Sequence, residues 1–475
     1  MTASTVTHEG QERARATGRR RWTALALLAT AQLMLILDVT VVNVALPAIG
    51  SSLRLHRGEL PWVMTMYTLL FGGLMLLGGR LADRFGARRL ALTGLVVFTG
   101  ASLLSGLASG SAELLAGRAL QGIGAALLSP AALATVLTMF DGRERDRALG
   151  VWSGIAGLGA ALGVILGGVL TSAIGWRWVF TINVPIGAAL LVALPMVVPA
   201  RRGTSSGARL DVPGALLVTA GTGAAIYGLV NAGSAGWAGL PTVLALAAAI
   251  AVWTVFVLVE RRTAEPLLAV GLLARRPVAA GGFLMLIATG LLAGGFFLGS
   301  FGLARAHGYS ALHVGLVFIP VAVAIVAGAH TASQVLARVT ARMVAPAGLA
   351  LAAAGYGVAA LWTSPAALVT GLSVAALGIG ACFVTAFTAS LASAGPAEGG
   401  LRSALVNTFH ELGGAAGVAV LSSVAGAALV AAHPAAGAFR AAFTVGASVA
   451  LAAAVIAGFL VPAVLRDPSA GRPAH

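Results

Sequence analysis

Lysine is missing from this sequence, cysteine occurs once, at Cys382, and charged residues of all kinds make up only 9% of its 475 residues. A soluble domain carries about 25% charged residues, so this scarcity of charge excludes an ordinary soluble protein. A single cysteine excludes an intramolecular disulfide, and because Cys382 lies in an apolar run we expect it to be inert. Hydrophobic residues take the place of charge, at 59% of the chain, as in a protein that lies in lipid.

The remaining charge is mostly positive: 30 arginines against 15 acidic residues give a net charge of +15. In a soluble chain this excess would indicate nucleic-acid binding. Here the arginines are confined to short polar segments between apolar runs, as the positive-inside rule describes, so we expect no nucleic-acid partner. The sequence has no metal-ligand cluster, nucleotide-binding loop or nucleophile–base pattern. It therefore predicts neither an enzyme nor a cofactor or metal site.

Apolar runs of about 20 residues, the length that spans a bilayer as a helix, recur along the chain. They predict about fourteen membrane-spanning helices, at 22–46, 60–78, 89–108, 113–137, 148–171, 177–198, 212–231, 239–259, 278–301, 312–336, 344–362, 366–393, 402–428 and 439–463. The first run continues past Asp38 without a small-residue cleavage site, so we expect a retained span rather than a signal peptide. With the N-terminus inside, the predicted cytoplasmic segments hold 24 arginines and the outer segments 5. This bias predicts that both termini are cytoplasmic.

The segment GGRLADRFGARRL, from Gly78 to Leu90, lies between the second and third predicted spans. We expect Gly79 and Gly86 to let the backbone turn at the two ends of a polar hairpin. The pattern resembles the signature of the major facilitator superfamily, whose cytoplasmic loop latches the two halves of the transporter together. That resemblance implies latch residues at Gly79, Asp83, Arg84, Gly86, Arg88 and Arg89. The alternative is an ordinary arginine-rich loop.

The first span contains LDVTVVNVALP, from Leu37 to Pro47, which places Asp38 in mid-membrane. A carboxylate there is costly unless it is paired or protonated, so it is a functional candidate. The segment resembles the first span of the fourteen-span drug:H⁺ antiporters of the EmrB/QacA type, and Asn43 is a candidate for the substrate cavity. The alternative is that Asp38 only makes local hydrogen bonds near Pro47.

The fourth span reads LLAGRALQGIGAAL and contains Arg118, Gln121 and Gly122. It resembles the fourth-span motif of the same family, in which the arginine is linked to proton transfer. We therefore predict that Arg118 acts with Asp38, and that Gln121 and Tyr67 of the second span line the substrate cavity. The alternative is that Arg118 extends to a membrane interface.

The fifth span carries glycines at a spacing of four, which lets two helices pack closely. The predicted packing residues are Gly154, Gly159, Gly163, Gly167 and Gly168. The run resembles the motif that characterises antiporters, but Val164 stands where that motif has proline. The proline kink is therefore in doubt here, while the glycine face is retained.

The thirteenth span begins LRSALVNTFHELGGAAGVA and places Asn407, His410 and Glu411 on one broad face. The family commonly has Arg-Gln where this chain has His410 and Glu411. Glu411 is a candidate second proton or cation site, and Asn407 and His410 are cavity candidates. Equally open is the alternative that Glu411 lies near the cytoplasmic interface and is solvated there.

Together the resemblances imply an all-α membrane protein of the major facilitator fold, two six-helix bundles with two inserted helices. The expected organisation is a cytoplasmic tail (1–21), a bundle (22–198), a linker with two extra helices (199–277), a second bundle (278–463) and a cytoplasmic tail (464–475). The implied function is export of a hydrophobic drug or antibiotic in exchange for protons, by a monomer in the plasma membrane. The alternatives are a proton symporter of a small metabolite and a membrane sensor that transports nothing.

Overall fold

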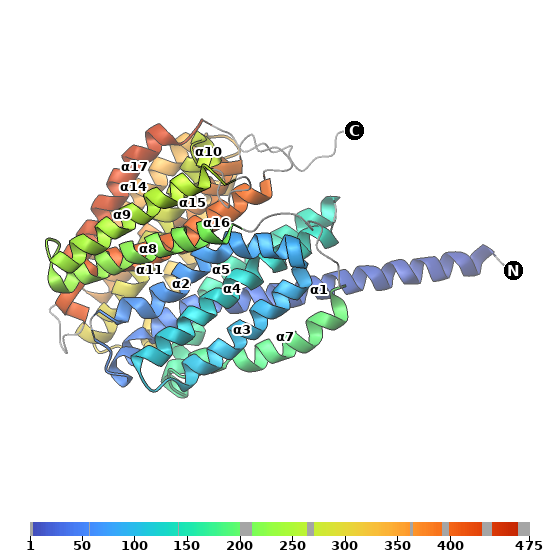
Figure 1. Ribbon diagram of the computed structural model, residues 1–475, viewed down its shortest axis with the longest axis horizontal. Coiled ribbons are helices and arrows are strands. Elements are labelled where there is room, and N and C mark those ends of the chain that lie inside the picture. Colours follow the sequence, from blue (N-terminus) through green and yellow to red (C-terminus); the bar gives the residue numbers. More distant parts are fainter. Residues whose placement is uncertain are drawn as a thin grey trace.

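The chain is described by a computed structural model that covers residues 3–56, 58–140, 142–199, 211–263, 270–361, 364–391, 399–429 and 439–463 (Figure 1). Within these ranges it is helical and has no strand. The first half contains α1 (Ala3–Ser52), α2 (Leu60–Phe85), α3 (Ala87–Leu107), α4 (Ser111–Met139), α5 (Gly142–Ala173), α6 (Trp178–Thr181) and α7 (Asn183–Val197). A hairpin follows, formed by α8 (Val212–Ala235) and α9 (Leu240–Glu260). The second half contains α10 (Val270–Leu273), α11 (Arg276–Ala306), α12 (Ala311–Val317), α13 (Ile319–Val335), α14 (Ala341–Leu361), α15 (Pro365–Leu391), α16 (Gly399–Ala425), the 3₁₀ turn η1 (Gly426–Leu429) and α17 (Arg440–Leu460).

Twelve helical stretches of the described residues are long and apolar enough to cross a membrane. In two of these stretches a pair of consecutive helices makes one span, α6 with α7 and α12 with α13. Two other helices, α5 and α16, overlap the predicted spans 148–171 and 402–428 but are not among the twelve. The all-helical membrane fold is therefore confirmed, while the count of fourteen spans stays a prediction.

The turn between α2 and α3 is shorter than the sequence suggests. α2 continues unbroken to Phe85, and Gly86 alone separates it from α3, with a φ of +93°. That backbone conformation favours glycine. The prediction that Gly79 also forms a turn is wrong, because Gly79 lies inside α2, which carries Asp83 on its last turn. The end of the bundle where α2 meets α3 is called the near end below, and the end where α3 meets α4 is the far end.

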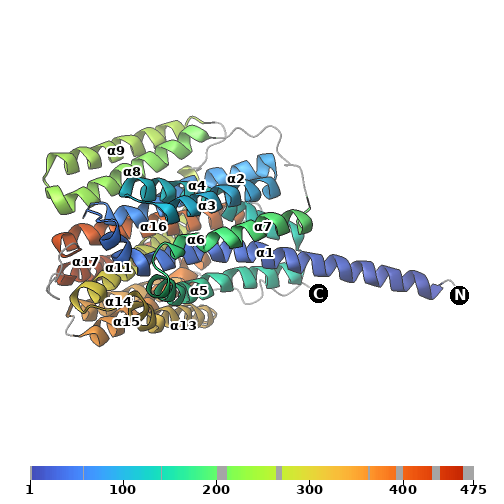
Figure 2. The same cartoon turned by 90° about the horizontal axis from the view of Figure 1, so that it is seen from below.

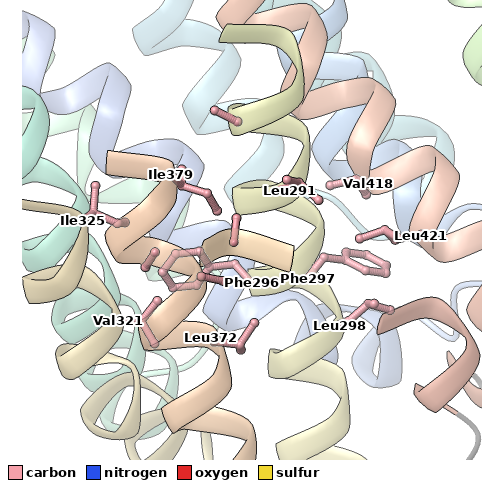
Figure 3. Packing of buried hydrophobic residues seen from close by; sticks show 14 of the residues in the cluster. Leu291, Phe296, Phe297, Leu298, Val321, Ile325, Leu372, Ile379, Val418 and Leu421 are labelled. Carbon is pink, nitrogen blue, oxygen red and sulfur yellow. The ribbon is translucent and has the colours of Figure 1, made fainter. Parts of the chain in front are cut away.

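Apolar side chains fill the interior of each half. In the first half, a buried cluster on α1 to α4 includes Leu28, Phe98 and Ala125. In the second half, Leu291, Phe296, Leu372 and Ile379 come together from α11 and α15, as Figure 3 shows. The second-half cluster also takes in residues 41–64 of α1 and α2, so the two halves pack together toward the far end.

The α8–α9 hairpin packs on the outside of the seam between α2 and α16, and α8 contacts both of these helices (Figure 2). Consecutive glycines of α2 make this possible. A side chain at Gly72 would meet Glu411 and Leu412 of α16, and a side chain at Gly73 would meet Thr219 of α8. The absence of side chains at these two positions lets α2 approach α16 and α8 closely.

Arginines bind the last helix of each half at the near end. Arg20 donates from Nε to the carbonyl of Val197 (3.1 Å) and from Nη2 to the carbonyl of Met196 (3.2 Å), at the end of α7. Arg276 makes the same fork on the carbonyls of Leu460 and Phe459, at the end of α17. A second arginine joins each fork: Arg88 donates to Pro195 (2.9 Å) and Arg342 to Gly458 (2.9 Å). Positive charge at a helix C-terminus is favourable, so each half is fastened in the same way.

Candidate functional site

A buried ion pair lies in the middle of the first half. Asp38, on α1, is 1% exposed, and Arg118, on α4, is fully buried. Nη1 of Arg118 donates to Oδ2 of Asp38. Two buried charges are tolerated only when they are paired and hydrogen-bonded, so neither side chain can lose its partner without a large penalty. The structure thus brings the two predicted residues together.

Arg118 has further partners that hold its guanidinium in place. Its Nε donates to the carbonyl of Val63 on α2 (2.8 Å). The guanidinium carbon lies 4.5 Å from the centre of the Tyr67 ring and 5.9 Å from that of Phe180. A cation over an aromatic face is attracted to it, more strongly where water is excluded. Arg118 would therefore keep favourable contacts if Asp38 became neutral.

Asp38 accepts two hydrogen bonds besides the one from Arg118. Nε2 of Gln121 donates to its Oδ1 (2.9 Å), and Nδ2 of Asn183 on α7 donates to the same oxygen (3.3 Å). Gln121 is in turn held by Ser102 and Ser105 of α3, whose hydroxyl oxygens lie 2.9 and 3.2 Å from its amide. A carboxylate that accepts from three donors is satisfied in its ionised form.

Two of the cavity candidates, Tyr67 and Gln121, lie next to the buried ion pair. The structure buries both Tyr67 and Gln121 completely, so neither lines an open cavity here. Tyr67 lies under the Arg118 guanidinium, and Gln121 lies in the hydrogen-bond network of Asp38. Asn43, the third candidate in this half, is 5% exposed.

Three residues of the network were not predicted: Ser102, Ser105 and Asn183. The two serines stand three residues apart on α3, in an otherwise apolar run, and both are fully buried. That spacing places them on one helix face, which is the signal that could have identified them.

In the second half, His410 and Glu411 lie on α16 against different neighbours. Nδ1 of His410 is 3.0 Å from the Thr289 hydroxyl of α11, and its ring centre is 5.6 Å from that of Phe383. Glu411 faces α2, where the missing side chain of Gly72 leaves it room. No described residue forms a hydrogen bond or an ion pair with its carboxyl group. Asn407, one turn earlier, is partly exposed.

Glu411 lies at the seam between the two halves, at the level of Gly72. Gly72 is midway along α2 (Leu60–Phe85), and Tyr67 lies five residues earlier on the same helix.

The predicted latch residues spread over the near end. Asp83 is exposed, and Arg80 is its charged neighbour. The guanidinium of Arg84 lies 5.6 Å from the centre of the Phe85 ring, and Arg89 is exposed. Arg88 reaches another helix, through its hydrogen bond to the end of α7.

The glycines of α5 face α1 and α12. A side chain at Gly159 would meet Ile36, one at Gly163 would meet Thr40, and one at Gly167 would meet Val41, all on α1. Gly168 lies against Ala311 and Leu312 at the far end, beside a hydrogen bond from the Leu312 amide to the Ser172 hydroxyl (3.0 Å). The surroundings of Gly154 and the side chain of Val164 lie outside the described residues.

Within the ranges that the structure covers, no three His, Cys, Asp or Glu side chains gather in one place. Two buried or partly buried carboxyl groups are present, Asp38 in its ion pair and Glu411 at the seam. Acidic side chains inside a membrane-spanning bundle are candidates for a functional role.

Comparison with known proteins places the chain in a family. Residues 28–418 match the Major Facilitator Superfamily, and the chain belongs to it. It is 40% identical over 418 residues to the puromycin resistance protein pur8 of Streptomyces alboniger, covering 85% of this chain and 82% of that one. It is 39% identical over 412 residues to the cephamycin export protein CmcT of Amycolatopsis lactamdurans, covering 85% of each chain. The lincomycin resistance protein of Streptomyces lincolnensis is 36% identical over 420 residues, with 86% and 85% coverage.

Solved structures share the fold. A bacterial homologue of the lysosomal transporter Spinster, inward-facing and unoccupied, matches with a TM-score of 0.66 at 17% identity, over 94% of this chain and 99% of that one. An auto-inhibited peptide transporter of the POT family matches with a TM-score of 0.69 at 16% identity, over 95% and 99%. Identities this low show the fold alone. Family and relatives together identify a membrane transporter whose relatives confer antibiotic resistance or export antibiotics.

Proposed function

We propose that this protein exports a hydrophobic drug or antibiotic from the cell in exchange for protons. The observation that carries the proposal is the fully buried pair of Asp38 and Arg118. A charge pair in mid-membrane is costly and marks a site of ion movement. The antibiotic resistance and export proteins among the relatives support a drug as the cargo.

The exchange follows from the two states of Asp38. In the structure Asp38 is paired with Arg118, and the proposal requires this pair to open for Asp38 to bind a proton. Entry of a proton from outside and binding of drug from inside then alternate at the same network. One proton that crosses about 100 mV releases about 2.3 kcal/mol, enough for roughly a fifty-fold drug gradient.

Other residues have supporting roles in this proposal. Glu411 is a second, auxiliary carboxyl site that widens the substrate range toward cations, next to His410 and Asn407. The latch residues around Asp83 stabilise one conformation of the cycle. The arginine bias supports a cytoplasmic position for both termini. In the proposed fourteen-span arrangement, the α8–α9 hairpin is the inserted pair.

Everted membrane vesicles provide the test. Acidifying the vesicle lumen should drive accumulation of a fluorescent hydrophobic drug in vesicles that contain the wild type. Vesicles with Glu113→Gln, a change at the far end of α4, serve as the matched control and should behave like the wild type. Drug release on acidification, or no movement at all, would contradict antiport.

A further inference from the structure

The amide of Gln121 is buried between three helices and uses its full capacity for hydrogen bonds. Its Nε2 donates to Oδ1 of Asp38 on α1 (2.9 Å) and to the hydroxyl oxygen of Ser102 on α3 (2.9 Å). Its Oε1 accepts from Nη1 of Arg118 (3.0 Å) and from the hydroxyl of Ser105 (3.2 Å). Two donors and two lone pairs are thereby satisfied.

In the observed arrangement every partner of Asp38 is a donor, which suits its ionised form. A neutral carboxyl group has one O–H to donate. One of its oxygens faces the amide donors of Gln121 and Asn183, and the other faces Arg118, which has only donors. A proton on Asp38 would therefore lack an acceptor among these partners, and an unpaired buried donor is unfavourable.

A half-turn of the Gln121 amide supplies the acceptor. Its Oε1 would then face Asp38 and Ser102, and its Nε2 would face Ser105. Each serine hydroxyl can rotate to donate or to accept, so both fit either position of the amide. Arg118 cannot adapt, because its Nη1 donor would face the turned Nε2 donor.

We propose that Gln121 is a positioning residue whose amide has two positions, and that it couples protonation of Asp38 to release of Arg118. With Arg118 bound, the amide donates to an ionised Asp38. With the amide turned, it accepts from a protonated Asp38 and excludes the guanidinium. This inference rests on the proposed function in one respect: Asp38 must be the group that binds the exchanged proton.

Charged and titratable neighbours of Asp38 are few in the described structure. They are Arg118 from α4 and Tyr67 from α2, whose ring lies under the guanidinium; Glu411 of α16 packs against the same helix α2 at Gly72. α7 contributes the neutral amide of Asn183, and the described glycines of α5 that face α1 carry no charge. Any pH response of the site must therefore be separated from that of Glu411.

The two serines make the proposal testable, because they are not equivalent in the two positions. In the observed position Ser105 shares Oε1 with Arg118, but in the turned position it is the sole partner of Nε2. Loss of Ser105 therefore penalises mainly the turned, protonated state. Ser102 and Asp38 contact the same atom of the Gln121 amide in both positions, Nε2 in the observed one and Oε1 in the turned one. Loss of the Ser102 hydroxyl therefore affects both states alike.

The measurement is the pH titration of the Asp38 carboxyl band, by infrared difference spectroscopy of the purified protein in detergent. The signal is the part of the spectrum that Asp38→Asn removes, which separates it from Glu411. Ser105→Ala should weaken proton binding about tenfold, a downward shift of about one pH unit in the midpoint, as loss of one buried hydrogen bond predicts. Ser102→Ala should shift it by less than about 0.3 unit on the same scale.

Two further variants complete the test. Thr135→Val removes a buried hydroxyl on α4 that bonds to the carbonyl of Ala131 in its own helix, and should leave the midpoint unchanged. On a Gln121→Leu background, Ser105→Ala should add no shift, because the amide it acts through is gone. Equal shifts for the two serine variants, or a Ser105→Ala shift that persists without Gln121, would overturn the proposal. A wild type that shows no Asp38 titration and releases no proton on drug addition would overturn the proton-exchange function as well.

Discussion

Replacing Asp38 with asparagine removes the carboxylate that pairs with Arg118 and preserves its shape. The guanidinium is then a buried charge without a counter-ion, and breaking a buried pair costs about 3–5 kcal/mol. Because Arg118 keeps its contacts with the Val63 carbonyl and the Tyr67 ring, we expect a loss of stability at the lower end of this range, about 3 kcal/mol. Asparagine cannot carry a proton, so the drug gradient should fall from roughly fifty-fold to none.

The assay compares wild-type and Asp38→Asn protein in everted vesicles and in detergent. Uphill drug accumulation should disappear, while neutral drugs still bind, since their binding depends mainly on apolar walls. Arg118→Ala should fail in the same way, and the double variant should be little worse than either single variant, because the two residues act as a unit. If Asp38→Asn protein still releases a proton per drug and still concentrates drug, the coupling residue lies elsewhere and Glu411 is the next candidate.

Three further outcomes are expected. Asp83→Asn should slow transport but leave the drug Kd nearly unchanged, because Asp83 lies at the near end, remote from the buried pair; an equal loss of affinity would count against this. Glu411→Gln should narrow the substrate range for cations while neutral drugs are still exported, and loss of every substrate in the vesicle assay would make it a primary coupling site. Burial acts to raise the pKa of Glu59, but hydrogen bonds from His56 and Ser111 outweigh it, so the pKa is lowered below 4.5. The ionised Glu59 carboxylate therefore stabilises the fold above pH 4.5, and this stabilisation is lost as the pH falls through its lowered pKa. Glu59→Gln should lower the melting temperature at pH 7 and not at pH 3. Equal decreases in melting temperature at the two pH values would refute this.

The helices could be predicted because apolar runs of membrane length leave little choice of structure. The position of the turn at the near end was harder to predict. α2 continues past Gly79 and through Asp83, because polar residues at the end of a span do not stop a helix and only the positive φ of Gly86 does. The number of spans could not be settled in the same way, since α5 and α16 are helical but do not appear among the twelve candidate stretches.

The charged residues of the candidate site could be predicted from the sequence, but most of their neutral hydrogen-bond partners could not. Asp38 and Arg118 stand out because a charge inside an apolar run must have a reason to be there. Ser102 and Ser105 do not stand out singly, because a serine hydroxyl can hydrogen-bond to a carbonyl of its own helix and is therefore tolerated in a membrane span. The contact of Tyr67 with Arg118 could not be predicted, because an aromatic residue on a helix suits a cavity or a cation equally well and the sequence does not show where Arg118 lies.

The arginine forks at the near end also relate the two halves to each other. Arg276 lies 256 residues after Arg20, and Arg342 lies 254 residues after Arg88. Arg20 and Arg88 bind the last helix of the first half, and Arg276 and Arg342 bind the last helix of the second. The two halves are therefore anchored at the near end by the same kind of contact, at similar spacings along the chain.

The second half has an apolar cluster in its interior, whereas the first half has a buried ion pair. Leu372 lies there with Leu291 and Phe296 in the cluster of Figure 3, close to Gly295. Both halves thus have the same arginine anchors, but their interiors differ in polarity. The first half holds a buried charge pair, and the described cluster around Leu372 in the second half is apolar.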